Sequence, residues 1–449
     1  MAILSKVQPV WLWVERSAHH YRLAMRTVLF ALPFLLALTS CSSEGSAKLD
    51  SLLNVANSDS SKNLFRIASS TDPKAAAKTM LEKKRAQWER DPMQLARDLK
   101  VAKRDFDKLM NALTGNVKKI WGRREMRLPG SKTYVKYTRQ YKSRAIVNFE
   151  QGEISVETLE ENADASLKNA IIATLLTPED PASVDVFSDS AIKLSSKSNP
   201  FLLGLVLNDA GQEITTSELA AGFADKLLPM AGTRIIQTDN GNKPVRFVTF
   251  RMIANFEDQK AQKYLQVVRK YAKQYNVSPS LVLGVIRTES SFNPHAVSAA
   301  PAYGLMQLVP TSGGREAYRR ARNQDITPSK DFLFDPENNI ELGAAYLGVL
   351  TYDQLDGVED RTARDYCVIS AYNTGPSNVM RAFTNAKGKQ RFSEGLQHIN
   401  SLSPSQVFQT LREKLPYDET RNYLPTVNSN RKRYYSLDKT VSSDYTKIP

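Results

Sequence analysis

Cysteine and histidine are scarce in this 449-residue chain. The only cysteines are Cys41 and Cys367, and there are four histidines. A disulfide framework, a metal site and a Ser-His triad are therefore poorly supported. Cys367 lies in the helical pattern RDYCVISAYN, where a buried small hydrophobe is a better interpretation than a nucleophile. We expect no disulfide, no metal and no cofactor.

The apolar run near the amino terminus, TVLFALPFLLALTS over 27–40, is too short to span a membrane, which needs about 20 residues. It follows two arginines and fits the hydrophobic region of a signal peptide, with a buried core helix as the alternative. The run ends in LTSC, which resembles the bacterial lipobox. That resemblance implies a signal peptide over 1–41 and lipidation of Cys41, and the true start could be Met1 or Met25.

The residue after the lipobox cysteine is Ser42. In such proteins an aspartate there retains the chain in the inner membrane. The resemblance therefore implies an anchor in outer-membrane lipid through Cys41, with the protein facing the periplasm. Residues 42–104 are rich in Ser, Asn, Asp and Lys and are predicted to form a tether with some helix.

Acidic residues are fewer than basic ones, which gives a formal charge of +14 and favours an anionic partner. Residues 118–144 hold ten Lys or Arg against one Glu, with aromatic residues interleaved. Such a patch could stack sugars or bases. The alternative is a solvated basic face above buried strand aromatics. Export makes nucleic acid a poor candidate, so peptidoglycan carboxylates or anionic lipid head groups are better ones.

The rest of the chain divides into two patterns, which predict an α+β fold class. Between 105 and 256, AIVNFEQGEISVETL alternates about a Gln151-Gly152 turn and PVRFVTFRMI predicts another strand, with a helix over ASLKNAIIATLL. This predicts a small α+β domain. From 257 to 449 the period is helical, with Ser278 and Pro279 as a helix start and further helices near 339–352 and 362–373. The second domain is predicted to be all-α.

Glu289 is the candidate that carries chemistry. It lies near the end of the helical run SLVLGVIRTES and shares a helix face with Val282, Val285 and Ile286. Partial burial there would raise the pKa of the carboxyl, as a proton donor near neutral pH requires. A glutamate reaching solvent from a helix end is the alternative.

Four ordered blocks resemble the Slt-type lytic transglycosylases of the goose-type lysozyme superfamily: ESSFNPHAVS, AYGLMQLVP, AYNTG and YDETRNYLPTV. The resemblance implies a lysozyme-like catalytic domain in which Glu289 is the sole catalytic acid and base. It implies that Tyr372 hydrogen-bonds the carboxyl and that Ser298 and Asn373 hold the acid or the sugar's acetamido group. Substrate-binding residues by this resemblance are Ser290, Ser298, Met306, Gln307, Tyr372, Asn373 and Tyr423.

The family's reaction cleaves the β-1,4 bond between N-acetylmuramic acid and N-acetylglucosamine of peptidoglycan strands and closes a 1,6-anhydro ring, without water. Two alternatives remain. A hydrolytic muramidase would need a second carboxylate, for which Asp325, Asp331 and Asp335 are candidates. A catalytically silent wall-binding lipoprotein could instead grip peptidoglycan through residues 118–144. Cell-wall synthesis or division proteins are further candidate partners, and the sequence does not distinguish cleavage at strand ends from cleavage within strands.

Overall fold

The computed structural model describes residues 107, 110–192, 198–298, 302–388 and 390–438. The predicted signal peptide, lipidated Cys41 and tether lie outside these ranges. Of the described residues, 110–322 and 330–438 belong to one compact unit, and 323–329 are not part of it; we call this compact unit the second unit. Within the described residues, no helix has the length and apolar character needed to cross a membrane.

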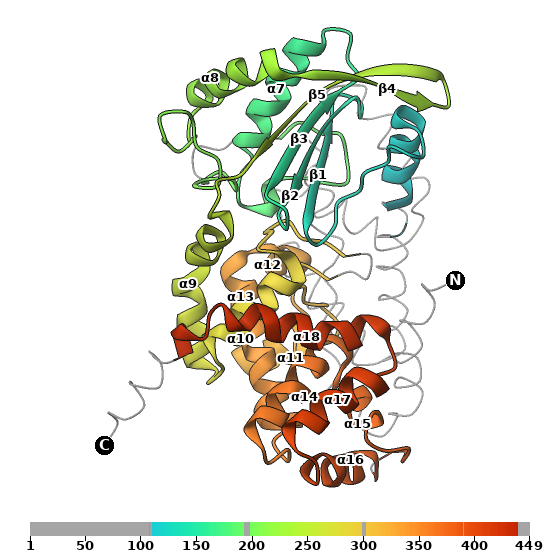
Figure 1. The fold of residues 1–449 in the computed structure, drawn as a ribbon, viewed down its shortest axis with the longest axis vertical. Helices are drawn as coiled ribbons and strands as arrows, with labels where there is room; N and C mark the ends of the chain where they lie inside the picture. The colour runs from blue at the N-terminus through green and yellow to red at the C-terminus, as the bar shows by residue number, and fades with distance from the viewer. Residues whose placement is uncertain (1–106, 108–109, 193–197, 299–301, 389, 439–449) are drawn as a thin grey trace, which may run out of the picture. The chain divides into compact units, whose positions relative to one another are not determined.

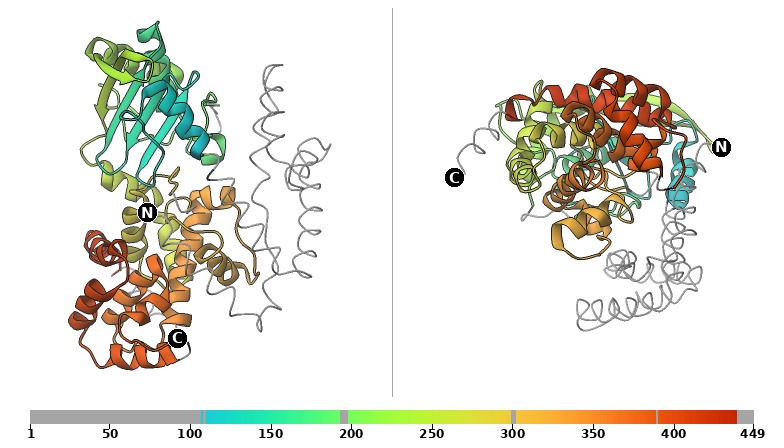
Figure 2. Two further views of the ribbon diagram at one scale, coloured as in Figure 1. Left: turned by 90° about the vertical axis from the view of Figure 1, so that its right-hand side faces the viewer. Right: turned by 90° about the horizontal axis from the view of Figure 1, so that it is seen from below.

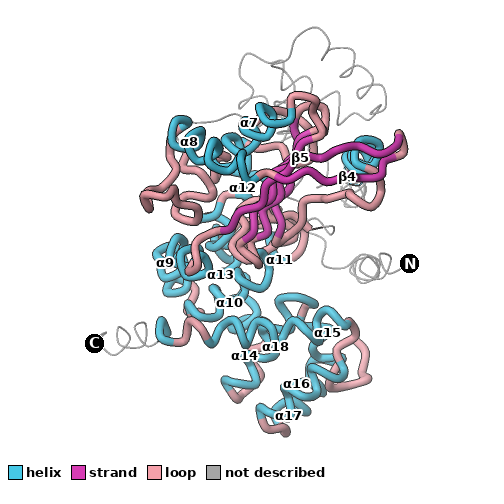
Figure 3. The backbone as a smooth tube through the Cα atoms, turned by 45° about the horizontal axis from the view of Figure 1, so that its top comes forward, coloured by secondary structure: helices cyan, strands magenta, loops and turns pink. Residues whose placement is uncertain are grey.

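A five-stranded antiparallel sheet forms the first part of the second unit, in the order β1-β2-β3-β5-β4 (Figures 1 and 3). Residues 110–121 are helical, and two further α-helices lie between the third and fourth strands within the described residues. The elements are β1 (Thr133–Thr138), β2 (Ser143–Asn148), β3 (Glu153–Thr158), α7 (Ala163–Leu175), η2 (Pro181–Ser183), α8 (Ser217–Leu227), η3 (Leu228–Met230), β4 (Gly232–Thr238) and β5 (Gly241–Arg251).

The β2–β3 hairpin forms because its turn residues suit a tight reversal. The Asn148 side chain accepts hydrogen bonds from the backbone N–H groups of Glu150 and Gln151, both at 3.0 Å. Gly152 has φ +65°, and a Cβ there would lie 2.7 Å from the Phe256 ring. The hairpin, the β5 strand and the α7 helix confirm the sequence predictions, whereas β1, β4 and α8 were not predicted individually.

The aromatic residues of the basic segment 118–144 are mostly core residues. Trp121 and Tyr137 are fully buried, and Tyr134 nearly so. The guanidinium of Arg144 lies 3.7 Å from the Trp121 ring centre and pairs with Glu157 at 2.6 Å. The interpretation of these three aromatics as a stacking surface is therefore wrong, because their rings are buried in the core of the sheet domain.

Within the described residues after 255, the named elements are all helices, as predicted (Figure 2). Ser278 caps a helix, accepting a hydrogen bond from Leu281 N at 3.2 Å, and Pro279 is its first residue. Cys367 is fully buried, and burial raises the pKa of its thiol to about 12. The helices are α9 (Phe256–Gln274), α10 (Pro279–Ser290), α11 (Gly313–Arg322), α12 (Lys330–Phe334), α13 (Pro336–Val349), η4 (Leu350–Gln354), α14 (Arg361–Thr374), α15 (Pro376–Arg381), α16 (Gln390–Asn400), α17 (Pro404–Lys414) and α18 (Asp418–Lys432).

Helices α10 and α18 pack against each other in opposite directions. Arg431, late in α18, donates to Ser280 early in α10 at 3.0 Å, and Asn430 donates to Thr288 at 3.0 Å. The helices approach closely at Gly284, where a Cβ would lie 3.1 Å from Arg431. This packing brings the start of α18 to the end of α10, where Glu289 lies.

Candidate active site

Glu289 occupies the last turn of α10 and is half-buried. The helix ends abruptly because Ser291 and Phe292 both adopt left-handed backbone conformations, with φ of 49° and 63°. Non-glycine residues rarely adopt that conformation, and it concentrates at functional sites. The carboxyl is thereby held at a helix end, beside a sharp turn of the chain.

Two tyrosines surround this carboxyl. Tyr423 of α18 donates its hydroxyl to Glu289 Oε1 at 2.7 Å. Burial, followed by the charge of Glu289, raises the pKa of Tyr423 well above its ordinary value, and the same two causes act on Tyr372 of α14. Both phenols therefore keep their protons at any working pH. Tyr423 is thus a permanent hydrogen-bond donor to the carboxyl.

Tyr372 lies close to Glu289 but directs its hydroxyl elsewhere. The hydroxyl donates to the backbone carbonyl of Met306 at 2.8 Å. The expectation that Tyr372 hydrogen-bonds the carboxyl is thereby corrected, because its one proton is used on the loop before α11. Its hydroxyl fixes that loop, and Tyr423 donates directly to the carboxyl.

Ser290 and Met306 lie beneath the site. Both are fully buried. The Ser290 hydroxyl donates to Leu305 O at 2.7 Å and accepts from Phe292 N at 3.2 Å. The Met306 sulfur fills the space at Gly343, where a Cβ would come within 2.0 Å of it. Neither side chain is accessible to a substrate, so the geometry favours a positioning role over the predicted substrate contact.

The loop that carries Met306 has its own internal support. Gly304 has φ +73°, and a Cβ there would lie 2.3 Å from Leu333 O, so only glycine fits. Asn339 accepts from Met306 N at 2.7 Å and donates to Tyr303 O at 2.9 Å. The side-chain amide of Gln307 donates to Ala296 O and Gly304 O at 3.1 and 2.9 Å. Gln307 therefore stabilises the loop from within. Asn339, which holds the same loop, was not predicted as a site residue.

Asn373 is oriented by Thr420, which was also not predicted as a site residue. Thr420, nearly fully buried in α18, donates its hydroxyl to Asn373 Oδ1 at 2.6 Å. This bond occupies the amide oxygen of Asn373, and the amide NH₂ group is the donor that can serve a ligand. Thr420 lies three residues before Tyr423, on the same helix face, and that spacing was the available signal. Ser298 is half-buried, and its backbone N–H donates to Ala302 O at 3.2 Å.

The candidate second carboxylates have other surroundings. Asp335 caps α13 and accepts a hydrogen bond from Asn338 N at 2.8 Å. Burial raises the pKa of Asp331, which senses Lys330 and Asp180. Asp325 lies in 323–329, outside the unit that contains Glu289. Among the described residues, no group of three or more His, Cys, Asp or Glu side chains could hold a metal ion.

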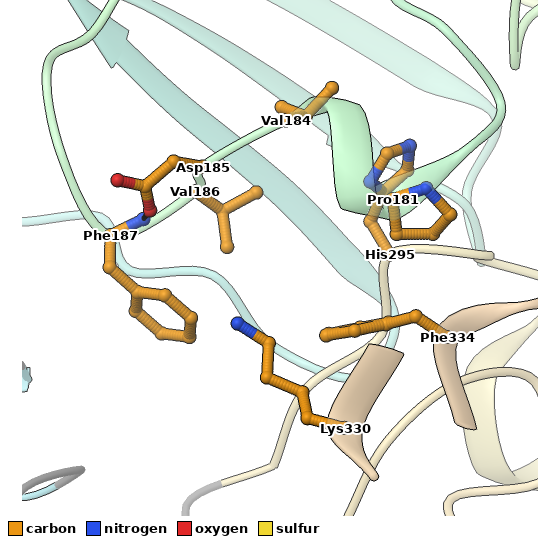
Figure 4. A pocket seen from close by; sticks show the side chains of 8 residues that line it. All are labelled: Pro181, Val184, Asp185, Val186, Phe187, His295, Lys330 and Phe334. Atoms are coloured by element: carbon orange, nitrogen blue, oxygen red, sulfur yellow. Dashed lines mark hydrogen bonds between the residues drawn. The ribbon is translucent and has the colours of Figure 1, made fainter. Parts of the chain in front are cut away.

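A small cavity lies where the sheet domain meets the loop after α10 (Figure 4). Its volume of about 20 Å³ has room for about one water molecule. His295 lines it and shares a hydrogen bond of 3.2 Å with Pro178 O through Nε2, while its buried Nδ1 has no protein partner in the described ranges. The cavity is too small for a sugar, so we assign it to the domain junction.

Comparison with known proteins agrees with this architecture. The family model "Membrane-bound lytic murein transglycosylase C, N-terminal domain" matches residues 99–263, and "Transglycosylase SLT domain" matches 266–394. Fold and site thus define a two-domain protein with an SLT transglycosylase domain. Membrane-bound lytic murein transglycosylases C of Yersinia pestis and Yersinia pseudotuberculosis are each 43% identical over 331 residues, covering 73% of this chain and 89% of theirs. The chain belongs to the membrane-bound lytic murein transglycosylase C family.

A solved structure gives a weaker match. The 70-kDa soluble lytic transglycosylase of Escherichia coli is 22% identical over 40% of this chain and 25% of its own, with a TM-score of 0.29. At that score the likeness supports no further conclusion, and the family assignment stands on the sequence relatives.

Proposed function

We propose that this protein is a peptidoglycan lytic transglycosylase that cleaves the β-1,4 bond between N-acetylmuramic acid and N-acetylglucosamine and leaves a 1,6-anhydromuramoyl end. The observation that carries the proposal is the Glu289 carboxyl, held at 2.7 Å by the Tyr423 hydroxyl at the end of α10. Membership of the transglycosylase C family supports the same reaction.

In the proposed reaction Glu289 transfers two protons in turn, first as the acid and then as the base. As the acid it protonates the glycosidic oxygen, so the bond to the muramoyl C1 breaks and N-acetylglucosamine leaves. The muramoyl 2-acetamido group stabilises the anomeric centre, as an oxazolinium. Glu289, now a carboxylate, takes the proton of the muramoyl 6-hydroxyl, whose oxygen bonds to C1. The carboxyl is restored and no water is consumed, so the enzyme is a lyase.

The neighbouring side chains have separate roles in this cycle. Tyr423 stabilises the carboxylate stage by donating a hydrogen bond that it cannot lose by ionising. Asn373, held by Thr420 through its oxygen, presents an NH₂ donor for the sugar's acetamido carbonyl. Ser298 remains a candidate for holding the same group. A positioned proton transfer of this kind contributes about 10²- to 10⁴-fold to the rate.

The proposed location is the outer membrane, facing the periplasm, through lipid on Cys41. The motif LTSC and the name of the relatives, which are membrane-bound, support the anchor. The mass of the mature amino-terminal peptide tests it directly, because a peptide that begins at Cys41 without lipid contradicts this location.

The test of the activity is mass spectrometry of peptidoglycan digested by the full-length chain in detergent. We expect muropeptides one water lighter than hydrolytic products, and Glu289→Gln should lower the rate by at least about 10²-fold, because the amide cannot cycle a proton. Glu337→Gln is the matched control, since Glu337 forms an exposed ion pair with Lys270 on α9. Hydrolytic products would convert the assignment to a muramidase, and full activity of Glu289→Gln would reject Glu289 as the acid.

A further inference from the structure

Five exposed basic side chains gather at the end of the helix over 110–121 and on the turn that follows it, and we call them the basic cluster. Its members are Lys118, Lys119, Arg123, Arg124 and Arg127. In the part of the chain that the structure describes, none of the five forms an ion pair. They take no part in the core or in the site around Glu289, so neither explains why they are concentrated here.

The other basic residues of this region are engaged elsewhere. Arg144 lies in the core, and the buried ammonium of Lys136 donates to two backbone carbonyls, at 2.7 and 2.9 Å. Lys132 and Lys142 each form an ion pair with a glutamate. Arg139 is exposed on the turn after β1. The cluster is therefore the part of the basic segment whose charge is left for a partner.

The positive charge of the sheet domain is concentrated at the cluster. Residues 118–127 hold five Lys or Arg against one Glu, whereas 128–255 hold 13 Lys or Arg against 15 Asp or Glu. Glu125 does not offset the cluster, because it pairs with Arg144 and Arg234 at 3.4 and 2.8 Å. An asymmetry of this kind directs one face of a domain toward an anionic surface.

The helix over 110–121 directs its two lysines outward. Val117 and Trp121 are fully buried, and their spacing of four residues places them on one helix face. Lys118 and Lys119 leave the helix at other angles and are exposed. The same helix that fills the core with a tryptophan therefore presents two ammonium groups to solvent.

The turn after this helix gathers the arginines beside the edge strand β4. Gly122 has φ +77°, and a Cβ there would lie 2.6 Å from Gln237 O of β4. The Arg127 guanidinium folds back and donates to Arg124 O at 3.4 Å and to Met126 O at 3.1 Å. The cluster is thus a compact group of cations that the backbone holds at the surface.

The chemistry of the cluster suits lipid phosphates better than sugars or wall peptides. Trp121 and Tyr137 are fully buried, so their rings are not available to stack on sugars. Peptides of the wall carry ammonium as well as carboxylate groups, whereas the cluster has one sign of charge. Each basic side chain near an anionic bilayer favours binding about fivefold, and guanidinium groups bind phosphate oxygens in pairs.

We propose that the basic cluster docks on anionic phospholipid head groups of the membrane in which the chain is anchored. The proposal rests on the proposed function, because the lipid on Cys41 is what brings this membrane within reach and raises its local concentration. The catalytic helices belong to the same compact unit as the sheet domain. Docking therefore also limits how those helices face the wall.

The test measures how strongly a bilayer shields Lys118 and Lys119 from an amine-acylating reagent. The lipidated full-length chain is reconstituted in vesicles of phosphatidylcholine, with or without about 30% of the anionic lipid phosphatidylglycerol. Peptide mass spectrometry gives the acylation of the two lysines relative to that of Lys414, which is exposed on α17. We expect the anionic vesicles to lower this ratio at least about fivefold. Salt at about 1 M, where the Debye length is about 3 Å, should restore it.

Charge changes on the turn test the cluster directly. Arg123→Glu/Arg124→Glu should abolish the shielding, and Arg123→Gln/Arg124→Gln should weaken it. Both variants should keep the urea midpoint of the natural chain, because the two side chains are exposed. The matched control is Arg361→Glu/Arg412→Glu, which changes the net charge equally at exposed positions of α14 and α17 and should keep the shielding of the natural chain.

Equal acylation in the two kinds of vesicle, or shielding that survives Arg123→Glu/Arg124→Glu, overturns the docking while leaving the anchor and the activity intact. Loss of shielding in the control variant also overturns it, since net charge and not the cluster would then be responsible. Shielding by purified sacculi but not by anionic vesicles assigns the cluster to the wall and overturns the lipid partner. A chain whose Cys41 carries no lipid overturns the proposed anchor and the docking with it, whereas absence of anhydro product contradicts only the proposed reaction.

Discussion

The sheet domain and the catalytic helices both bury charged side chains, but they use them differently. In the sheet domain, Arg144 is enclosed between Trp121, Glu125 and Glu157, so its charge is neutralised inside the core. In the helices, Glu289 is only half-buried and is held by a phenol that carries no charge. The difference separates two kinds of ionisable residue. A fully buried and paired charge serves stability, whereas a half-buried carboxyl beside a neutral donor can exchange a proton.

The largest effect is expected on the sheet side of this comparison. Arg144→Met removes the cation that neutralises Glu157, which is only 6% exposed, and leaves a buried carboxylate with the more distant Arg234, at 3.3 Å. We expect a loss of about 3–5 kcal/mol in the free energy of unfolding, measured by urea denaturation. Lys226→Met, which breaks the exposed pair with Asp209, should cost less than about 1 kcal/mol. Equal losses in the two variants would refute the structural role of the Arg144 network.

A smaller effect is expected where the two regions meet, at His295. Burial, the largest cause, lowers the pKa of its imidazole to about 4, against the opposing influences of Pro178 O and Asp180, while Lys263 lowers it further. The folded state therefore resists protonation, and the unfolded state, with a pKa near 6.5, accepts it. Stability from this residue is complete above pH 6.5 and falls as the pH drops toward 4.

Between pH 7 and pH 5 this linkage amounts to about 2 kcal/mol, at 1.36 kcal/mol per pKa unit. Urea midpoints at the two pH values measure it, and His295→Gln is the comparison because a glutamine does not titrate. The variant should show a flatter dependence on pH than the natural chain. If the two chains lose the same stability on acidification, carboxylates elsewhere account for the acid sensitivity and His295 does not.

The sequence predicted the secondary structure of the helices better than the placement of side chains. Periodicity was sufficient for α9, α10 and α14, because an apolar stripe is a local signal, and Ser278 and Pro279 added a helix-start signal for α10. It could not show that Tyr137 of the basic segment lies in the core, since alternation in β1 does not say which face of the sheet is covered. The Tyr137 ring packs against Trp121, at the end of the helix over 110–121, and that helix was not predicted.

At the site, family blocks located Glu289 and its neighbours but not their hydrogen bonds. Tyr372 and Tyr423 were both assigned to the site, yet which phenol reaches the carboxyl depends on how α14 and α18 pack against α10. Thr420 and Asn339 act through other residues, and a side chain that only orients another one leaves no catalytic pattern in a single sequence. These hydrogen bonds depend on how helices distant in sequence pack together, and local sequence patterns do not encode that packing.

The smallest predicted effect tests the helical side of the comparison, through the one hydrogen bond that distinguishes the two tyrosines. Tyr423→Phe keeps the ring but removes the donor that lies 2.7 Å from Glu289 Oε1, so the carboxylate formed after the first proton transfer loses stabilisation. We expect kcat to fall about tenfold, equivalent to ~1.4 kcal/mol, with little change in unfolding free energy, as measured by anhydro-product formation and urea denaturation. Tyr366→Phe on α14, whose ring packs against Phe408 at 5.0 Å between centroids, should leave kcat unchanged. Because the Tyr423 phenol stays protonated, the loss should be the same from pH 5 to pH 8, and a loss confined to one end of that range would mean that the hydroxyl transfers a proton instead of holding the carboxyl.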